Sequence, residues 1–367
     1  MICNRIRVSN FRNIESAEVK FDEGVNLLVG ANAQGKTNLL EAVFYAAIGK
    51  SFRTTSDEEM IRFGKDMLEI SMDFSDSLRG QNLTVRLLKG KRRRIEHNKV
   101  RLTKVSDVVG LFRVVLFCPE HLSIVKDGPG ERRNFLDVAL SQLYPAYMRG
   151  LQNYNKILKQ RNQLLRNAAE DPATFRETAE PWSAQLAHEA AILSRYRAQY
   201  CAKLNPEVKE IFAEMTGGGE VPELCYESSI HCEGADFENV EAIERAYLEK
   251  LMNNHEREIA AGNTLWGIHK DDIRMDLNGK PARTFASQGQ QRSMALAVKL
   301  AEGNICRAIC GEMPAYLLDD VFSELDGARR SYLAEKIKGR QVIITTCEEN
   351  LPTAGNLIRV ENGTYLQ

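Results

Sequence analysis

The stretch VNLLVGANAQGKTNLLEAVFYAAIG, residues 25–49, decides the fold of this 367-residue chain. Residues 25–29 form an almost entirely apolar run, which is typical of a strand buried on both faces. Residues 36–48 repeat apolar side chains at helical spacing, and Gly49 suits the end of a helix. The apolar residues that share one face of this helix are Leu39, Leu40, Val43 and Ala47. A buried strand, a glycine-containing loop and a helix in this order predict an α/β domain.

The loop between this strand and helix reads G-A-N-A-Q-G-K-T and matches the phosphate-loop pattern G-x-x-x-x-G-K-[ST]. Its backbone N–H groups and the helix N-terminus can surround the β- and γ-phosphates of a nucleotide. Lys36 adds a positive charge, and the Thr37 hydroxyl can bind Mg²⁺. The predicted residues for ATP and Mg²⁺ in this stretch are Gly30, Asn32, Gly35, Lys36, Thr37 and Asn38. The complete match disfavours the alternative, a glycine-rich turn that only caps a helix.

Two adjacent carboxylates follow a second apolar run, residues 315–318. A phosphate loop needs an acidic partner at the end of a neighbouring buried strand. We expect Asp319 to hold Mg²⁺, directly or through water, and Asp320 to orient and polarise the water that attacks the γ-phosphate. An Asp pair after a strand is also common in helix-capping turns, but the phosphate loop favours the catalytic interpretation. The predicted catalytic residues are therefore Asp320, Lys36 and Asp319.

The motif S-Q-G-Q-Q-R, residues 287–292, precedes a further helical run. Ser287 and Gln290 fit a capping box, which is a purely structural explanation. We favour a second one, in which Ser287, Gly289 and Gln290 form another anion-binding helix N-terminus. One nucleotide per chain does not need two phosphate-binding helix N-termini. We therefore expect the second N-terminus to bind the γ-phosphate of a nucleotide that is held by another copy of the chain. The loop S-E-L-D, residues 323–326, lies where a dimer contact is expected, and the sequence thus predicts an ATP-dependent homodimer.

Composition limits the class of protein. The chain has 49 Lys and Arg against 50 Asp and Glu, so any affinity for nucleic acid must come from a local patch. No apolar stretch is long enough to cross a bilayer, and the N-terminus lacks a secretory signal, so we expect a cytoplasmic protein without a membrane partner. The eight cysteines form no C-x-x-C pair and are interpreted as reduced, mostly buried thiols. The same interpretation is favoured over a metal site for Cys225, His231 and Cys232.

The order of the predicted elements indicates a domain interrupted by an insertion. Alternating apolar residues predict antiparallel strands before residue 22, and further strands are expected over 67–117 and at 342–346. Residues 131–215 predict two or three long helices, interrupted near Pro172, and another helix is expected over 239–261. Strand character returns near Leu265, and a terminal hairpin turns at Asn362-Gly363. The predicted division is an α/β head of residues 1–119 and 265–367, with a mainly helical lobe of residues 120–264.

The phosphate loop, S-x-G-Q, D-D and S-E-L-D, in this order, resemble the ATP-binding-cassette type of ATPase head. Transporter subunits place S-x-G-Q much closer to the loop, whereas Ser287 follows Lys36 by about 250 positions. This split head is similar to the SMC class. Within that class, several stretches resemble the RecF family of bacterial recombination mediators: N-F-R-N-I at 10–14, G-K-S-F-R at 49–53, F-C-P-E-H-L-S-I-V-K-D-G-P-G-E-R-R-N-F-L-D at 117–137 and L-L-D-D-V-F-S-E-L-D at 317–326.

The resemblance implies a slow, DNA-stimulated ATPase that dimerises with ATP on gapped duplex or on junctions between single-stranded and duplex DNA. It implies roles in DNA repair, replication, recombination and the SOS response, with RecR and RecO as partners that assist RecA loading. It also places Arg12 and Arg53 near the nucleotide or the dimer face. The chain departs from the family at His121, usually Asp, at Ile268, usually Pro, and at Cys347, usually a smaller residue. The alternatives are a DNA-junction binding module that does not hydrolyse ATP and, less favoured, a transporter ATPase.

The densest basic patch is K-G-K-R-R-R-I-E-H-N-K-V-R, residues 89–101, which is expected to turn at Gly90. A solvated hairpin would explain such charge, but a DNA-binding head makes phosphate contact the better interpretation. Arg132 and Arg133 are expected to extend the patch. The predicted DNA-binding residues are Lys91, Arg92, Arg93, Arg94 and Arg53.

Overall fold

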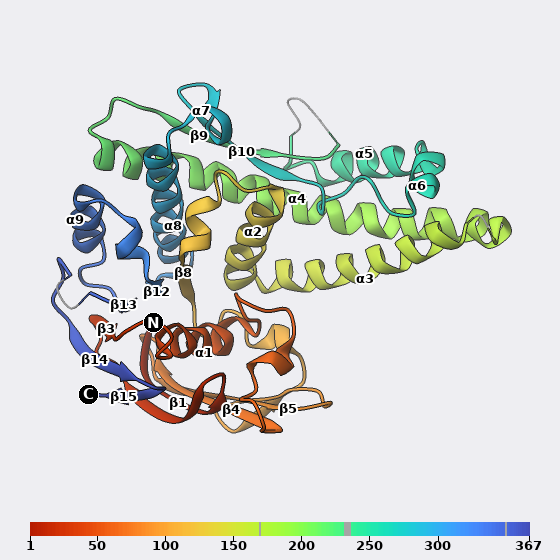
Figure 1. The fold of residues 1–367 in the computed structure, drawn as a ribbon. Coiled ribbons are helices and arrows are strands. Elements are labelled where there is room, and N and C mark those ends of the chain that lie inside the picture. Colours follow the sequence, from red (N-terminus) through yellow and green to blue (C-terminus); the bar gives the residue numbers. More distant parts are fainter. Residues whose placement is uncertain (169, 231–235, 349–350) are drawn as a thin grey trace. The chain divides into compact units, whose positions relative to one another are not determined.

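The computed structural model describes residues 1–168, 170–230, 236–348 and 351–367 (Figure 1). The chain divides into two compact units. The first contains Met1–Ser123, Ile211–Gly218 and Gln288–Gln367, and the second contains Ile124–Glu210 and Gly219–Ser287. Compared with the division expected from the sequence, residues 120–123 and 211–218 lie in the first unit and residues 265–287 in the second.

A mainly parallel sheet carries the phosphate loop in the first unit. Its order is β15-β14-β3-β13-β12-β8, and only β15 is antiparallel to its neighbour. The strands are β3 (Val25–Val29), β8 (Val114–Phe117), β12 (Ala315–Asp319), β13 (Val342–Thr346), β14 (Asn356–Glu361) and β15 (Thr364–Leu366). Every residue of β3, β8, β12 and β13 is buried, as in strands covered on both faces. The predicted apolar strands and terminal hairpin are confirmed.

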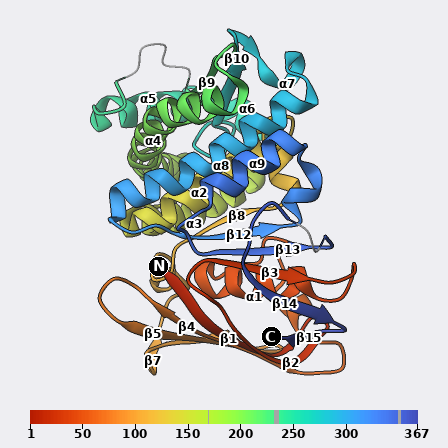
Figure 2. The same ribbon diagram turned by 90° about the vertical axis from the view of Figure 1, so that its left-hand side faces the viewer.

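A second sheet in the same unit is antiparallel, with the order β2-β1-β4-β5-β6-β7. Its strands are β1 (Ile2–Phe11), β2 (Ile14–Lys20), β4 (Met67–Ser75), β5 (Gly80–Leu88), β6 (Arg94–His97) and β7 (Val100–Leu102). Helix α1 (Lys36–Ile48) contacts β1 and β4 of this sheet and β12 and β13 of the parallel sheet, so it lies between them (Figure 2). The predicted bounds of α1 are confirmed, and Gly49 ends it in the left-handed conformation.

Two further helices complete the first unit. They are α8 (Gln288–Cys310) and α9 (Gly327–Lys336). Helix α8 contacts β8 and the 3-10 helix Pro119–Ser123. Helix α9 begins after Asp326, whose side chain accepts a hydrogen bond from the Arg329 N–H. The loop S-E-L-D therefore leads directly into a capped helix.

Long helices dominate the second unit. The helices are α2 (Pro129–Leu143), α3 (Pro145–Asn167), α4 (Pro172–Thr216), α5 (Val240–Met252), α6 (His255–Ala261) and α7 (Ala282–Phe285), and the last six residues of α4 lie in the first unit. A small sheet has the order β11-β10-β9, with β9 (Pro222–Glu227), β10 (Asp272–Leu277) and β11 (Lys280–Pro281). The prediction of long helices with a break before Pro172 is confirmed.

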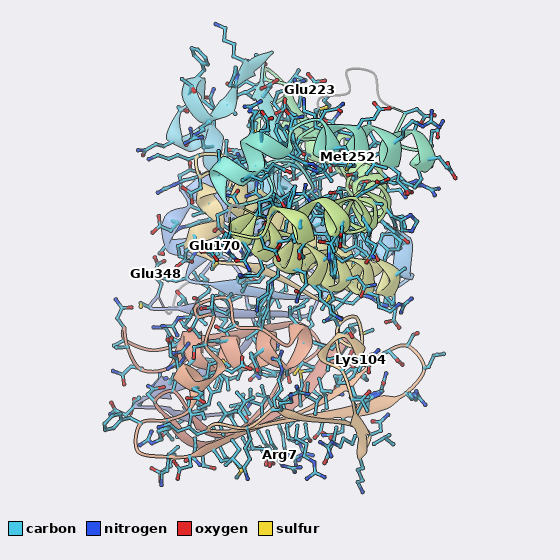
Figure 3. All side chains as sticks on the ribbon, turned by 90° about the vertical axis from the view of Figure 1, so that its right-hand side faces the viewer. Arg7, Lys104, Glu170, Glu223, Met252 and Glu348 are labelled. Atoms are coloured by element: carbon cyan, nitrogen blue, oxygen red, sulfur yellow. The ribbon has the colours of Figure 1, made fainter. Side chains whose placement is uncertain are left out.

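Two predictions for the second unit are corrected. The helix expected over 239–261 is two helices, because Asn253 ends α5 near Met252 (Figure 3) and Asn254 leaves helical geometry. Asn favours caps over helix interiors. The strand expected near Leu265 begins instead at Asp272. Before it, Gly267 has a φ of 143°, and a Cβ there would lie 2.2 Å from the Tyr154 hydroxyl, which is incompatible with a regular strand. Strand β9 was not predicted.

A buried ion pair holds the helical arm of the second unit together. Arg161 of α3 donates to Glu258 of α6 over 2.5 Å, and both side chains are at most 2% exposed. The same guanidinium donates to Ser183 and Thr264, so four segments meet at one side chain. Glu258 also accepts a hydrogen bond from the Leu265 N–H. Every polar group in this cluster therefore has a partner, as burial requires.

Replacing one member of this ion pair should lower the free energy of unfolding more than neutralising both members does. Arg161→Leu leaves the Glu258 carboxylate unpaired, and we expect it to lower the free energy of unfolding by about 3 to 5 kcal/mol. Adding Glu258→Gln removes the charge while keeping an acceptor for Leu265, so the double variant should recover part of that loss. Urea titration followed by circular dichroism measures both, with Lys159→Leu on the exposed face of α3 as the control. A double variant less stable than Arg161→Leu would contradict the expectation.

Candidate functional site

The phosphate loop has a conformation that requires its two motif glycines. A Cβ on Gly30 would lie 2.3 Å from the carbonyl oxygen of Val360 in β14. Gly35 has a φ of 111°, and a Cβ there would lie 2.9 Å from the Asn13 side chain. Both positions therefore exclude a larger residue, one because of the neighbouring strand and one because of backbone strain as well.

The C-terminal hairpin holds this loop from outside. The N–H of Gly363 donates to the Gln34 carbonyl over 2.8 Å, and the N–H of Asn362 donates to the Gln34 side chain over 2.6 Å. The Tyr365 hydroxyl donates to the carbonyl of Gly35 over 2.9 Å. The hairpin thus binds the carbonyls of Gln34 and Gly35, in the second half of the loop.

The side chain of Lys36 folds back onto the phosphate loop. Its ammonium donates to the carbonyls of Gly30 and Ala31 over 2.6 and 2.9 Å, and to the Cys347 sulfur over 3.3 Å. Beside it is a cavity of 370 Å³. The residues that line this cavity are Asn13, Asn32, Ala33, Gln34, Gly35, Lys36, Thr37, Asn38, Arg53, Asp320 and Thr345. Of the six residues predicted to bind ATP and Mg²⁺ in the phosphate-loop stretch, all except Gly30 line this cavity.

Thr37 and Asp319 are brought together as the predicted metal site requires. The Thr37 hydroxyl donates to Asp319 Oδ1 over 2.8 Å, and the Thr345 hydroxyl donates to the same oxygen over 2.6 Å. Burial raises the pKa of Asp319, and no ion pair involves its carboxylate in the described part of the chain. Two oxygen donors side by side, one of them a buried carboxylate without a cation, fit Mg²⁺, which prefers oxygen ligands.

Asp320 faces the cavity from the end of β12. Its φ of 51° is left-handed, a conformation that Asp and Asn tolerate better than most residues. Its N–H donates to the carbonyl and hydroxyl oxygens of Thr345 over 3.1 and 2.9 Å, which fixes this turn. Burial raises the pKa of the Asp320 carboxyl. The sharp turn directs the two adjacent carboxylates to different surroundings, Asp319 to the threonines and Asp320 to the cavity.

A buried carboxylate that the sequence analysis missed organises the rim of the cavity. Glu41 is fully buried, and it accepts hydrogen bonds from Arg12 over 2.8 Å, from Arg53 over 3.2 Å and from Ser51 over 2.5 Å. Arg53 also donates to Asn38 over 2.8 Å. Of the two arginines, only Arg53 lines the cavity. The sequence feature that could have pointed to Glu41 is the presence of one carboxylate among the apolar residues of helix 36–48.

Asn13 is a second lining residue that was not singled out. Its side-chain oxygen accepts a hydrogen bond from the Asn38 amide over 2.7 Å, and its carbonyl accepts one from Arg62. It belongs to the stretch N-F-R-N-I, whose presence pointed to the family but not to the role of this residue.

The residues of the second predicted anion site lie in the first turn of α8 or directly before it in the sequence. Ser287 is the last residue of the second unit, and Gly289 and Gln290 begin α8. None of the three lines the phosphate-loop cavity, and the Arg329 guanidinium lies 3.3 Å from where a Cβ of Gly289 would be. Their predicted contact with a nucleotide on another copy stays a prediction.

Contacts connect the start of α8 with the loop after β13. Arg292 donates to the Glu324 carboxylate over 2.9 Å, and Arg330 of α9 donates to both oxygens of Glu348 over 2.8 and 3.1 Å. The loop of residues 323–326 is therefore held between α8 and the segment that places Cys347 against Lys36.

The basic residues predicted to bind DNA have different surroundings. Lys91 and Arg92 are exposed, and Arg94 is exposed with Glu96 at 3.3 Å. Arg93 instead donates to the Tyr45 hydroxyl over 2.9 Å and to the Gly49 carbonyl. This inward contact differs from the expected role in DNA binding, because the guanidinium already has partners within the first unit.

Arg132, in the second unit, gives one further correction. Arg132 is buried and donates to both oxygens of Asp272 over 2.6 and 2.9 Å, so it does not extend a DNA-binding surface. His269 accepts or donates a hydrogen bond with the Tyr154 hydroxyl over 2.7 Å, and burial lowers its pKa to about 4. Asp271 is buried and its pKa is raised for the same reason.

The thiols give a mixed result. Cys3, Cys118, Cys201 and Cys306 are buried, Cys310 is partly buried, and Cys225 and Cys347 are exposed, which corrects the expectation of a buried thiol at Cys225. His231 and Cys232 lie outside the described residues, and within the described ranges no group of three His, Cys, Asp or Glu could hold a metal ion. None of the helices formed by the described residues combines the length and apolar character needed to span a bilayer.

Comparisons with known proteins agree with this geometry. The family model RecF/RecN/SMC N terminal domain matches residues 2–364. The DNA replication and repair protein RecF of Clostridium acetobutylicum is 38% identical over 368 residues, 99% of each chain, and that of Acetivibrio thermocellus is 37% identical over 371 residues, 100% of each.

Solved structures give the same result. The recombination mediator protein RecF-ATP in the RecFOR pathway has a TM-score of 0.93 and 31% identity, covering 100% of this chain and 98% of that one. An Smc head bound to the C-winged helix domain of ScpA has a TM-score of 0.56 at 16% identity over 100% of this chain and 96% of that one, a likeness of fold alone.

Replacing the lysine of the loop should abolish nucleotide binding. Lys36→Met removes the one ammonium that lines the cavity while keeping the length of the side chain, so we expect no measurable binding of ATP by isothermal titration calorimetry. Lys20→Met, on exposed strand β2, is the control and should bind as the unmodified chain does. Retained binding by Lys36→Met would reject the assignment of this cavity.

Proposed function

The chain belongs to the RecF family of recombination mediators, SMC-like ATPases of DNA replication and repair, and we propose that it is a slow ATPase whose nucleotide state controls binding to DNA. The observation that carries the proposal is the position of Lys36, Thr37 and Asp320 on one cavity, with Asp319 bonded to Thr37. A protein that only stored a nucleotide would not need a carboxylate facing the phosphates.

Different residues of the cavity are proposed to have different roles in ATP hydrolysis. Thr37 and Asp319 would hold Mg²⁺, which supplies neutralising charge to the β- and γ-phosphates when bound. Lys36 adds positive charge at the same phosphates. Asp320 accepts the proton of the attacking water, and its raised pKa makes it a stronger base than an ordinary carboxylate. Because Asp320 must be ionised, turnover should fall as the pH falls through this raised pKa.

Turnover is expected to be slow for a reason visible at Cys347. The corresponding segment of transporter heads carries a His that senses the γ-phosphate, whereas here a thiol contacts Lys36 and Asn32. A thiol is a weak hydrogen-bonding group and does not provide the positive charge of an imidazolium. The bound state, rather than the product, is then the functional output.

Dimerisation is proposed to complete the site. Ser287, Gly289 and Gln290 would bind the γ-phosphate held by the phosphate loop of a second copy, so that ATP joins two molecules. This assignment is based on the motif S-Q-G-Q-Q-R, whose last five residues form the N-terminal end of α8. Hydrolysis would remove the shared phosphate and allow the two copies to separate.

The joined molecules are proposed to bind gapped duplex DNA or junctions of single-stranded and duplex DNA in the cytoplasm. RecR, together with RecO, would be the protein partners. The complex would assist the loading of RecA and would take part in the SOS response. The exposed Lys91, Arg92 and Arg94 support a phosphate-binding surface. The alternative is a junction-binding module that keeps ATP without hydrolysing it.

A bulky residue at the second anion site should prevent dimerisation without preventing ATP binding. We expect Ser287→Arg to remain monomeric with a non-hydrolysable ATP analogue and gapped DNA, because its side chain occupies the position of the phosphate from the other copy. Light scattering gives the molar mass, and Ser16→Arg on exposed strand β2 is the control. Normal dimerisation by Ser287→Arg would exclude the shared-phosphate arrangement.

Neutralising the proposed base should trap the ATP-bound dimer. Asp320→Asn keeps a residue that tolerates a φ of 51° and leaves Asp319 in place, but it cannot accept the proton of the attacking water. We expect turnover to fall at least about 100-fold and ATP-bound dimers to accumulate. Phosphate release and light scattering measure the two effects, with Asp22→Asn as the exposed control. Undiminished turnover would remove Asp320 from the chemistry, whereas unchanged release of DNA would favour the module that does not hydrolyse ATP.

A further inference from the structure

One aromatic side chain of the first unit is completely exposed. Phe63 lies at the tip of the turn Arg62-Phe63-Gly64-Lys65, which the N–H of Lys65 closes by donating to the Arg62 carbonyl over 3.0 Å. Gly64 has a φ of 77°, as the third residue of such a turn requires. The N–H of Arg62 donates to the Asn10 carbonyl over 2.9 Å, so the turn is attached to β1. The ring is thus presented to solvent by a short, hydrogen-bonded support.

The turn adjoins the basic hairpin between β5 and β6. The N–H of Lys89 donates to the Asp66 carbonyl over 2.9 Å, and Met67 pairs with Leu88 at the ends of β4 and β5. Together the exposed side chains form what we call the aromatic-basic surface. Its members are Phe63, Lys65, Met67, Leu88, Lys89, Lys91 and Arg92.

The carboxylates near this surface do not cancel its charge. Asp57 lies 3.4 Å from Arg93, which balances its charge, whereas Glu58 accepts a hydrogen bond from the Gly90 N–H over 2.9 Å and keeps its negative charge. Asp66 is exposed. Three lysines and Arg92 outnumber the carboxylates Glu58 and Asp66, so the aromatic-basic surface has an excess of positive charge.

An exposed aromatic ring among cations matches the chemistry of single-stranded nucleic acid. Such proteins stack bases on aromatic side chains and bind the backbone phosphates through Lys and Arg. A continuous duplex satisfies the charges but offers no free base to Phe63. We propose that the aromatic-basic surface binds the unpaired strand of gapped DNA, with Phe63 stacked on a base and the lysines at the phosphates. This inference rests on the proposed binding of DNA and adds the feature by which unpaired DNA is distinguished.

The same turn contacts the nucleotide site. Arg62 donates to the carbonyl of Asn13, which lines the phosphate-loop cavity. The proposed DNA contact therefore lies on a segment whose position depends on a residue of that cavity.

Anisotropy with labelled DNA tests the proposal, using the full chain and a non-hydrolysable ATP analogue. Phe63→Ala should weaken binding to gapped DNA by about 5- to 100-fold, the usual loss for one stacked base, and change binding to continuous duplex less than about twofold. Phe63→Trp should retain the affinity for gapped DNA. Leu78→Ala, which alters another exposed apolar residue outside the surface, is the matched control.

Salt dependence separates stacking from charge. Lys91→Ala should reduce the slope of log affinity against log salt by about 1, whereas Phe63→Ala should leave the slope unchanged because it removes no charge. Equal losses on gapped and continuous DNA, or no loss on either, would overturn the role of Phe63. Weaker ATP-dependent dimerisation of Phe63→Ala without DNA would instead assign the ring to an interface between copies. Failure of the unmodified chain to bind gapped DNA would refute the proposed function itself.

Discussion

The parallel pairing of β3 with β13 is the interaction on which the rest of the structure depends. It aligns Val29 with Thr346 and so joins residues near the start of the chain to residues near its end. Parallel strands end at the same edge of a sheet, and the loops that follow them meet there. Lys36 consequently contacts Cys347, and Thr37 contacts Asp319, although each pair is far apart in the sequence. β14 adds the hairpin that holds the phosphate loop from outside.

Two buried carboxylates of the first unit, Glu41 and Asp319, have different surroundings. Glu41 has two arginines and a serine, so its charge is compensated within the protein. Asp319 has two threonine hydroxyls and no cation at ion-pair distance in the described ranges, and burial raises its pKa. An uncompensated buried charge is costly, and natural structures keep one where a ligand supplies the missing partner. The charge of Glu41 is therefore compensated within the protein, whereas Asp319 keeps the surroundings expected of the proposed Mg²⁺ ligand.

The helical unit uses buried polar contacts differently. Arg161 and Arg197 are both almost fully buried, and each guanidinium joins segments that are distant in the sequence. These pairs have complete hydrogen bonding, which makes them contributors to a defined packing rather than candidates for chemistry. His269 and Asp271 belong to the same kind of network, because each shares a hydrogen bond with a buried tyrosine, Tyr154 and Tyr226 respectively.

The amino-acid sequence by itself determined the strand, loop and helix of residues 25–49 and the apolar strands at 114–117, 315–318 and 342–346, because local periodicity and the phosphate-loop spacing are properties of neighbouring residues. It also placed the carboxylates that follow β12. Only the tertiary structure decided which partners the long polar side chains bind. Arg93 donates a hydrogen bond to Tyr45, and Arg132 forms an ion pair with Asp272. Glu41 forms ion pairs with Arg12 and Arg53. A count of charges cannot distinguish these outcomes, since the direction of a long polar side chain depends on the partners that distant segments bring to it.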